Sequence, residues 1–345
     1  MRLLRTLLGV IMERDYYIFK SGRLERKDNT IYLETTDENN QPIKKPIPVE
    51  AVNSIYLMGE IDLNTRLLDF FCQNNIVLHN FNYYGHYSGS YYPREYLNSG
   101  FLLVRQVEHY KNKSRRLFIA REIVKSAAHN LKNNLRHYQK QEKDVESYIK
   151  TIESEEAKID TVKDICELMA VEGHIRDAYY QTFNKFLKLE KEFTKRVKQP
   201  PDNPINCLIS FGNMLVYTTV LSEIYHTHLN PTISFLHEPG TRRFSLSLDL
   251  AEIFKPILSD KVTFKLINNQ MIKPEHFDEK LNYCYLKEEG RKLYIREYDE
   301  RLQTTIDHRE LRRSVSYRHL IRLECYKLAK HILGEKEYRA FRAWW

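Results

Sequence analysis

The chain has 345 residues, of which 42% are hydrophobic; this excludes general disorder and leaves room for about two domains. Its formal net charge of +8 favours a polyanionic partner, either nucleic acid or an anionic membrane surface. The five cysteines are dispersed and form no C-x-x-C pair, which argues against a zinc site or a disulfide framework and favours a reducing cytoplasm.

The first residues faintly mimic a signal peptide. Residues 1–11 combine two arginines with a short apolar run, but no small-residue cleavage site follows. We therefore expect residues 1–11 to be an N-terminal extension, with Met12 as the usual start. No apolar run approaches the roughly 18 residues that cross a bilayer, so we expect no membrane partner.

Residues 12–97 are predicted to form a small β-rich domain. An Asp-Asn pair at 28–29 favours a turn, so the segments on either side of it should form a hairpin. Pro46 and Pro48 favour an edge strand, because proline cannot donate a hydrogen bond to a ladder. Further strands are expected at 16–19, 52–58 and 76–79, and a helix at 63–74 with Asn64 as its cap.

Tyrosines are concentrated at the end of this domain, within residues 83–92. Such rings could stack on nucleic-acid bases. More often they pack a hairpin or a dimer interface, and we favour that interpretation.

From residue 98 onward the pattern is helical, which gives an α+β fold with an α-helical domain over residues 98–345. The mixed-charge segment 139–158 is most simply a solvated helix, whereas 205–225 is apolar enough to be a central core helix. The remaining expected helices are 115–138, 248–266 with an interruption near Pro256, and a basic helix at 311–334.

The chain has no phosphate-binding loop, serine-hydrolase motif or dinucleotide fingerprint, so acidic residues and histidines in unusual settings are the candidates. Glu172 lies at the edge of an apolar stretch and is followed by Gly173 inside a helical run. A glycine there costs about 1 kcal/mol relative to alanine, which is tolerated where another group must approach the backbone. The simpler interpretation is a surface glutamate beside a helix kink.

His237 follows an apolar run and precedes a Pro-Gly turn, where a rigid scaffold can present a ligand. A lone histidine in this setting is more often structural. Asp249 and Glu252 are three residues apart and share one face of a helix. Ser247 can cap that helix, which places Asp249 in its first turn near the helix dipole. This account does not explain Glu252, whose neighbours are apolar.

Together these positions supply three carboxylates and an imidazole. Oxygen-rich sites with one nitrogen suit Mn²⁺, and Mg²⁺ with more bound water. Such an ion stabilises charge on a phosphodiester during in-line displacement, and basic helix faces would hold the nucleic-acid backbone. The residues alone leave three classes open: a metal-dependent enzyme, a non-catalytic nucleic-acid scaffold and a membrane-surface helical protein.

Several segments resemble the CRISPR-associated Cas1 family. FLHEPGTRRFSLSLDLAEIFKP resembles the family signature in which a histidine leads a turn and then a helix of pattern S-L-x-x-D-L-x-E-x-F-[RK]-P. Further resemblances are VEGHIRDAYY to E-G-x-x-R-x-x-Y, INCLISFGNMLVYT to N-x-L-[LI]-S-[FY]-x-x-x-L, and RRSVSYRHLIRLECYKLAKHILG to the C-terminal helix. The N-terminal domain is also similar, so the match runs from about Met12 onward.

The resemblance implies that Glu172, His237 and Glu252 are the metal ligands of a catalytic centre that takes Mg²⁺ or Mn²⁺. Some relatives use aspartate where Glu252 stands. It also implies that Asp249 supports the site or touches DNA. We expect DNA-backbone contacts, with a solvated or ion-paired surface as the alternative, from the nearby basic residues Arg176, Arg242, Arg243 and Lys255.

The resemblance further implies a β domain that dimerises and an α-helical catalytic domain. The implied activity is that of a DNA endonuclease and integrase that inserts short duplexes into a CRISPR array when their 3′-hydroxyls attack phosphodiesters. This transesterification keeps the energy of the broken bond and needs no ATP; water in place of the hydroxyl would nick or resolve branched DNA. The implied partners are double-stranded DNA, a second copy of the chain and a Cas2 protein.

Overall fold

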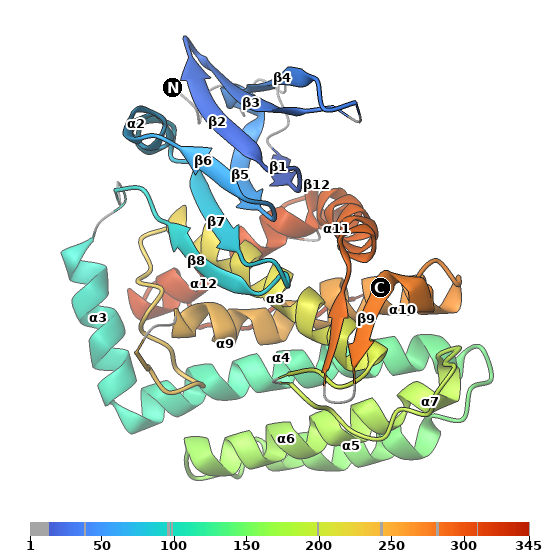
Figure 1. The fold of residues 1–345 in the computed structure, drawn as a ribbon. Helices are drawn as coiled ribbons and strands as arrows, with labels where there is room; N and C mark the ends of the chain where they lie inside the picture. The colour runs from blue at the N-terminus through green and yellow to red at the C-terminus, as the bar shows by residue number, and fades with distance from the viewer. Residues whose placement is uncertain are drawn as a thin grey trace. The chain divides into compact units, whose positions relative to one another are not determined.

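The computed structural model describes residues 14–37, 39–94, 97, 99–198, 200–241, 244–280, 283–308 and 310–344. The chain divides into two compact units, residues 1–96 and 97–345. The first unit is rich in strands and the second in helices, so the predicted α+β fold is confirmed (Figure 1). The expected extension at 1–11 lies outside the described residues, and the dimerising role of the first unit stays a prediction.

Two four-stranded sheets form the first unit. One sheet has the order β1 (Arg14–Ile18), β5 (Val52–Leu57), β7 (Val77–Phe81) and β8 (Tyr87–Tyr91), with only β8 antiparallel. The other has the order β4 (Pro42–Pro48), β3 (Thr30–Thr36), β2 (Gly22–Lys27) and β6 (Ile61–Leu63), with β6 parallel to β2. The predicted hairpin joins β2 to β3, and the proline-containing β4 is an edge strand, as predicted.

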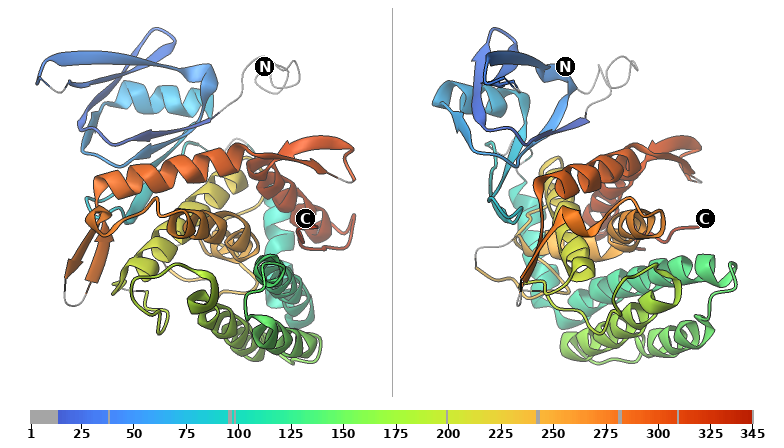
Figure 2. Two further views of the ribbon diagram at one scale, coloured as in Figure 1. Left: turned by 90° about the vertical axis from the view of Figure 1, so that its right-hand side faces the viewer. Right: turned by 45° about the vertical axis from the view of Figure 1, so that its right-hand side comes forward.

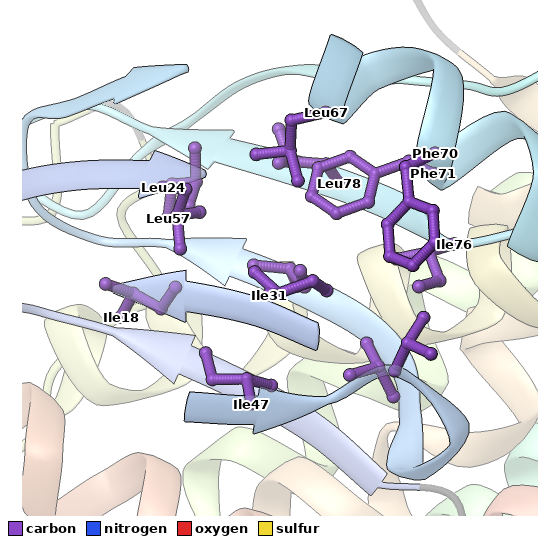
Figure 3. Packing of buried hydrophobic residues seen from close by; sticks show 13 residues of the cluster. Ile18, Leu24, Ile31, Ile47, Leu57, Leu67, Phe70, Phe71, Ile76 and Leu78 are labelled. Carbon is purple, nitrogen blue, oxygen red and sulfur yellow. The ribbon is translucent and has the colours of Figure 1, made fainter. Parts of the chain in front are cut away.

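Helix α2 (Thr65–Asn74) supplies one wall of the first unit's core. The side chain of Asn64 accepts a hydrogen bond from Leu67 N at 3.0 Å, so the predicted cap is confirmed. Leu67, Phe70 and Phe71 are fully or almost fully buried among the strand residues (Figure 3). Their removal from water is the main force that holds the helix in place.

The tyrosine-rich hairpin between β7 and β8 is packed at its base and exposed at its tip. The ring of Tyr87 lies 5.9 Å from that of Phe81, and the Tyr91 hydroxyl donates to Leu68 O at 3.3 Å. At the tip, the Tyr83 side chain is largely solvent-exposed. The packing interpretation is therefore confirmed for the strand tyrosines.

Ten helices and two hairpins are described in the second unit. The first helices are α3 (Gly100–Lys111), α4 (Lys113–Gln139), α5 (Glu146–Lys158), α6 (Ile165–Gln181) and the short α7 (Phe183–Phe186). The others are α8 (Pro204–Tyr225), α9 (Ser245–Phe254), α10 (Lys261–Asn268), α11 (Glu288–Gln303) and α12 (Tyr317–Ile332). The hairpins are β9 (Phe277–Lys280) with β10 (Tyr283–Leu286), and β11 (Thr305–His308) with β12 (Arg313–Ser316). Helices α5 and α6 lie alongside α4 (Figures 1 and 2).

Helix α8 is the central core helix that its composition predicts. Asn203 caps it by accepting a hydrogen bond from Asn206 N at 2.9 Å, and Pro204 occupies the first turn. Contrary to our expectation, α8 is long and apolar enough to meet the criteria for a membrane span. Most of it is buried inside the unit, which accounts for its apolar character.

Two helix predictions need correction. Residues 140–145 are not helical, and α5 is amphipathic rather than solvated, because Ile149 and Ile152 are buried. The last helix begins at Tyr317 instead of residue 311, because β12 pairs with β11. The predicted interruption at Pro256 is confirmed: a π-helical turn (Pro256–Asp260) separates α9 from α10.

Candidate functional site

Glu172 and Arg176 lie one turn apart on the same face of α6. Their neighbours Val171 and Ile175 are buried, so the charged pair sits at the edge of the core, with 20% and 17% of the side chains exposed. The Arg176 Nε donates to Glu172 Oε1. A Cβ at Gly173 would meet no described atom within 4 Å, so no described group of the chain approaches this glycine closely. The helix surface beside Glu172 is open instead.

Helix α9 presents Glu252 to the same guanidinium. Arg176 Nη2 donates to Glu252 Oε2, and Lys255 Nζ donates to Glu252 Oε1 at 2.6 Å. Only 8% of the Glu252 side chain is exposed. Because one planar guanidinium binds both carboxylates, the structure brings Glu172 and Glu252 together from two separate helices.

His237 is oriented by Asp249, which is completely buried. Asp249 Oδ2 accepts hydrogen bonds from the backbone N–H groups of Phe235 and Leu236 at 2.6 and 2.9 Å. Its Oδ1 accepts from the backbone N–H of His237 and contacts the ring Nδ1, both at 2.9 Å. An ionised carboxylate only accepts, so Nδ1 carries the proton of this contact, and in a neutral imidazole Nε2 is then the acceptor atom. A carboxylate behind a histidine is the usual second partner of a metal-binding imidazole.

We predicted that Asp249 is stabilised by the dipole at the start of its helix, and that prediction is wrong. Helix α9 begins at Ser245, two residues before the expected cap Ser247, and Phe244 makes no side-chain cap hydrogen bond. The Ser245 hydroxyl instead donates to Thr232 O at 2.7 Å. Asp249 therefore stabilises the backbone of the loop that carries His237, and not the start of its own helix.

The pKa of Glu172 depends on the charged groups around it, and His237 is one of them. Burial alone would raise the pKa of Glu172, but Arg176, Lys255 and His237 together hold it below its usual value. Glu172 is thus ionised at neutral pH, within electrostatic reach of His237.

Further charged groups surround the two glutamates. Burial, reinforced by Arg176, lowers the pKa of Lys255 to about 8. Burial and the charges of Lys255, Arg176 and Arg196 also lower the pKa of Lys198. Burial raises the pKa of Asp260 to about 6, although the nearby cations oppose that shift. The site is therefore a partly buried cluster in which each carboxylate lies close to one or more cations.

The loop that carries His237 is held by side chains from α3 and α4. The buried Gln106 donates to Asn230 O and Ile233 O, at 2.9 and 2.8 Å, and accepts from Asn230 N at 3.0 Å. Arg116 Nε donates to Phe235 O at 2.9 Å, and its guanidinium also pairs with Glu238. These contacts hold the backbone before His237 and the side chain of Glu238 directly after it.

Sequence reasoning missed several residues of this neighbourhood. Gln106 and Arg116 are ordinary helix positions with no local signal. Asp260 did have a local sequence signal, because it is an acidic residue within an apolar stretch, as Glu252 is. Of the expected DNA contacts, Arg176 and Lys255 bind the glutamates, whereas Arg242 and Arg243 lie outside the described residues.

Within the described part of the chain, no group of three or more His, Cys, Asp and Glu side chains is arranged to hold a metal ion. Arg176 and Lys255 instead occupy the oxygens of Glu172 and Glu252. The donor types nevertheless fit a hard divalent ion, since two carboxylates face the same point and the imidazole Nε2 has a free lone pair. The three ligand assignments stay predictions.

The two units and the paired glutamates with an oriented histidine define an α+β protein with a candidate site for phosphodiester chemistry. The family "CRISPR associated protein Cas1" matches residues 16–300, and the chain belongs to this family. "CRISPR-associated endonuclease Cas1 3" of Thermodesulfovibrio yellowstonii is 54% identical over 96% of this chain and 100% of that protein. The predicted resemblance is confirmed.

Solved structures agree with this assignment. A Cas1 protein from Thermotoga maritima is 42% identical, with a TM-score of 0.85 over 96% of this chain and 100% of that one. A casposase bound to integration product shares the fold at 19% identity, with a TM-score of 0.84 over 95% of this chain and 92% of that one. A Cas6-RT-Cas1–Cas2 complex does so at 17% identity, with a TM-score of 0.80 over 96% of this chain and 36% of that one.

Proposed function

We propose that this chain is a metal-dependent DNA endonuclease and integrase of CRISPR adaptation, which inserts short duplex DNA into a CRISPR array. The observation that carries the proposal is the convergence of Glu172 and Glu252 on one guanidinium, within electrostatic reach of a histidine that Asp249 orients. Membership of a family whose relatives are named endonucleases supports it.

Glu172, Glu252 and the Nε2 atom of His237 would hold Mg²⁺ or Mn²⁺. When bound, the ion would stabilise charge on the scissile phosphodiester and help to activate the attacking hydroxyl. Asp249 keeps the proton on Nδ1 of His237, so that Nε2 stays available as a donor atom. Gln106 and Arg116 hold the loop, so the imidazole is positioned before any substrate arrives.

Basic side chains of this chain would bind the backbone of the DNA. Arg176 and Lys255 would donate hydrogen bonds to phosphate oxygens, a role for which the planar arginine fork is well suited. In the integration step, a 3′-oxygen of the incoming duplex forms a bond to phosphorus as the repeat strand's own phosphorus–oxygen bond breaks. The proton of the attacking hydroxyl is lost, and the released 3′-oxygen gains one. Water in place of the hydroxyl gives nicking or resolution of branched DNA.

The proposed partners are double-stranded DNA, a second copy of this chain and a Cas2 protein. The fold shared with a casposase bound to integration product and with a Cas6-RT-Cas1–Cas2 complex supports the DNA and Cas2 assignments. Homodimerisation through the first unit rests on the family resemblance. A reducing cytoplasm is supported by the five cysteines, which are all free.

The test is Glu172→Gln in a gel assay with a labelled duplex, a repeat-containing plasmid and Cas2, with and without Mg²⁺ or Mn²⁺. Integration and nicking should fall by more than about 100-fold, while DNA binding survives. Mutation of a residue that only hydrogen-bonds to a metal ligand typically costs about 10–100-fold, and loss of a ligand itself should cost more. The matched control is Glu146→Gln, which changes an exposed glutamate paired with Lys150 and should integrate normally.

If Glu172→Gln integrates like the unaltered protein, Glu172 has no part in the mechanism. If the unaltered protein binds DNA but neither nicks nor integrates with any divalent ion, the chain is a non-catalytic scaffold. Binding to anionic liposomes without any affinity for DNA would favour the membrane-surface class.

A further inference from the structure

The oxygens of the two glutamates proposed to hold the metal are already engaged by resident cations. Arg176 binds Glu172 through Nε and Glu252 through Nη2. Lys255 binds the other oxygen of Glu252 at 2.6 Å. A divalent ion cannot use these oxygens fully until Arg176 and Lys255 have moved away or shared them.

The local charge opposes a metal ion that arrives alone. Arg176, Arg196 and Lys255 all lie within electrostatic reach of Lys198. The carboxylates that face these cations include those of Glu172, Glu252, Asp260 and Asp202. Arg176 and Lys255 already neutralise the two carboxylates proposed as ligands, so a divalent ion that arrives alone adds its charge beside resident cations. In a partly buried site this repulsion between cations is poorly screened by salt and unfavourable.

A DNA phosphate resolves both difficulties at once. It supplies negative charge, and its oxygens accept the same paired N–H donors that a carboxylate accepts. Once Arg176 and Lys255 turn toward phosphate, the oxygens of Glu172 and Glu252 are released. The displaced cations then keep a full set of hydrogen-bond partners, so neither is left buried and unpaired.

We propose that Arg176 and Lys255 couple metal binding to DNA binding, so that the site takes up its divalent ion tightly only when a DNA phosphate has drawn these two side chains off the glutamates. The inference rests on the proposed function, and it assigns Arg176 a second task beyond holding the DNA backbone. Because coupling between two ligands is reciprocal, the ion raises DNA affinity by the same factor.

The experiment is a Mn²⁺ titration of the full-length protein followed by the electron paramagnetic resonance signal of free Mn²⁺. It is run on protein alone, on protein with a short blunt duplex, and on the duplex alone as the reference for Mn²⁺ bound to DNA. Coupling factors between protein ligands commonly lie between about 5 and 150, and we expect the duplex to tighten Mn²⁺ binding by about 10-fold or more.

Variants separate the two cations from general charge effects. Arg176→Gln should bind Mn²⁺ more tightly than the unaltered protein in the absence of DNA, and the effect of the duplex should shrink. Lys255→Gln should act in the same direction and serves as the second variant if Arg176→Gln does not fold. The matched control is Arg136→Gln, which removes an arginine paired with Glu153 on the surface of the same unit and should leave both titrations unchanged.

The outcomes distinguish this inference from the proposed function. Equal Mn²⁺ affinity with and without the duplex, at a site lost in Glu172→Gln, would overturn the coupling but leave the metal centre intact. Unchanged or weaker Mn²⁺ binding in folded Arg176→Gln and Lys255→Gln would also overturn it. Failure to bind Mn²⁺ under either condition would remove the metal centre itself, and the coupling with it.

Discussion

Asp249→Asn should damage both the stability of the helical unit and its affinity for a metal ion, with almost no change in shape. Asp249 accepts three backbone N–H groups and the ring N–H of His237 while fully buried. Asparagine has one acceptor oxygen where aspartate has two. If that oxygen keeps Phe235 and Leu236, the new NH₂ group faces the backbone N–H of His237.

The magnitude follows from these contacts. Two hydrogen bonds to a charged acceptor become neutral ones, a loss of about 1 kcal/mol each, and one buried donor is left unsatisfied at about 1–3 kcal/mol. We therefore expect the free energy of unfolding to fall by about 3–5 kcal/mol. The new NH₂ group also favours the tautomer in which Nδ1 accepts and Nε2 carries the proton, which blocks Nε2 as a metal ligand.

Tryptophan fluorescence in a guanidinium titration reports on the correct unit, because both tryptophans stand at the C-terminal end, at 344 and 345. The guanidinium concentration at the unfolding midpoint should fall, with little change in the dependence of the unfolding free energy on guanidinium concentration. Asp307→Asn is the control: Asp307 accepts one bond from the Ser314 hydroxyl near the surface, so the change should cost less than about 0.5 kcal/mol. An Asp249→Asn protein with the unaltered midpoint and Mn²⁺ affinity would refute the reasoning.

Three further outcomes follow from other buried groups. Burial would raise the pKa of Glu223, but two α12 arginines outweigh it and hold this pKa at about 2, below the usual value of 4.5. A depressed folded pKa stabilises above the unfolded pKa, so about 3 kcal/mol should be lost as pH falls from 4.5 toward 2, and Glu223→Gln should flatten that dependence in denaturant titrations. Gln106→Leu should cost about 2–4 kcal/mol by leaving loop groups unsatisfied, and should lower integration in the gel assay as well. Gly212→Ala should cost about 1–3 kcal/mol in thermal melts, because its Cβ would overlap the buried Tyr294 hydroxyl, whereas Gly100→Ala meets nothing within 4 Å and should be nearly neutral.

Local signals predicted the elements that depend on local chemistry. The Asp-Asn turn gave the β2–β3 hairpin, and Asn64 capped α2 as predicted, because a cap needs only residues within one turn. The same kind of reasoning failed at Ser247. There the backbone N–H groups of residues 235–237 compete for Asp249, and a contact between such distant residues leaves no mark in the neighbouring sequence.

By itself, the sequence determined the family, the α+β class and the chemical types of the proposed ligands, because motif residues and hydrophobic periodicity are local properties. Only the tertiary structure decided how Glu172 and Glu252 are shared by Arg176, and that Asp249 holds the His237 loop. Those contacts depend on where separate helices and loops meet. The places where helices and loops meet follow from the packing of the whole helical unit, so they cannot be predicted from a short stretch of sequence.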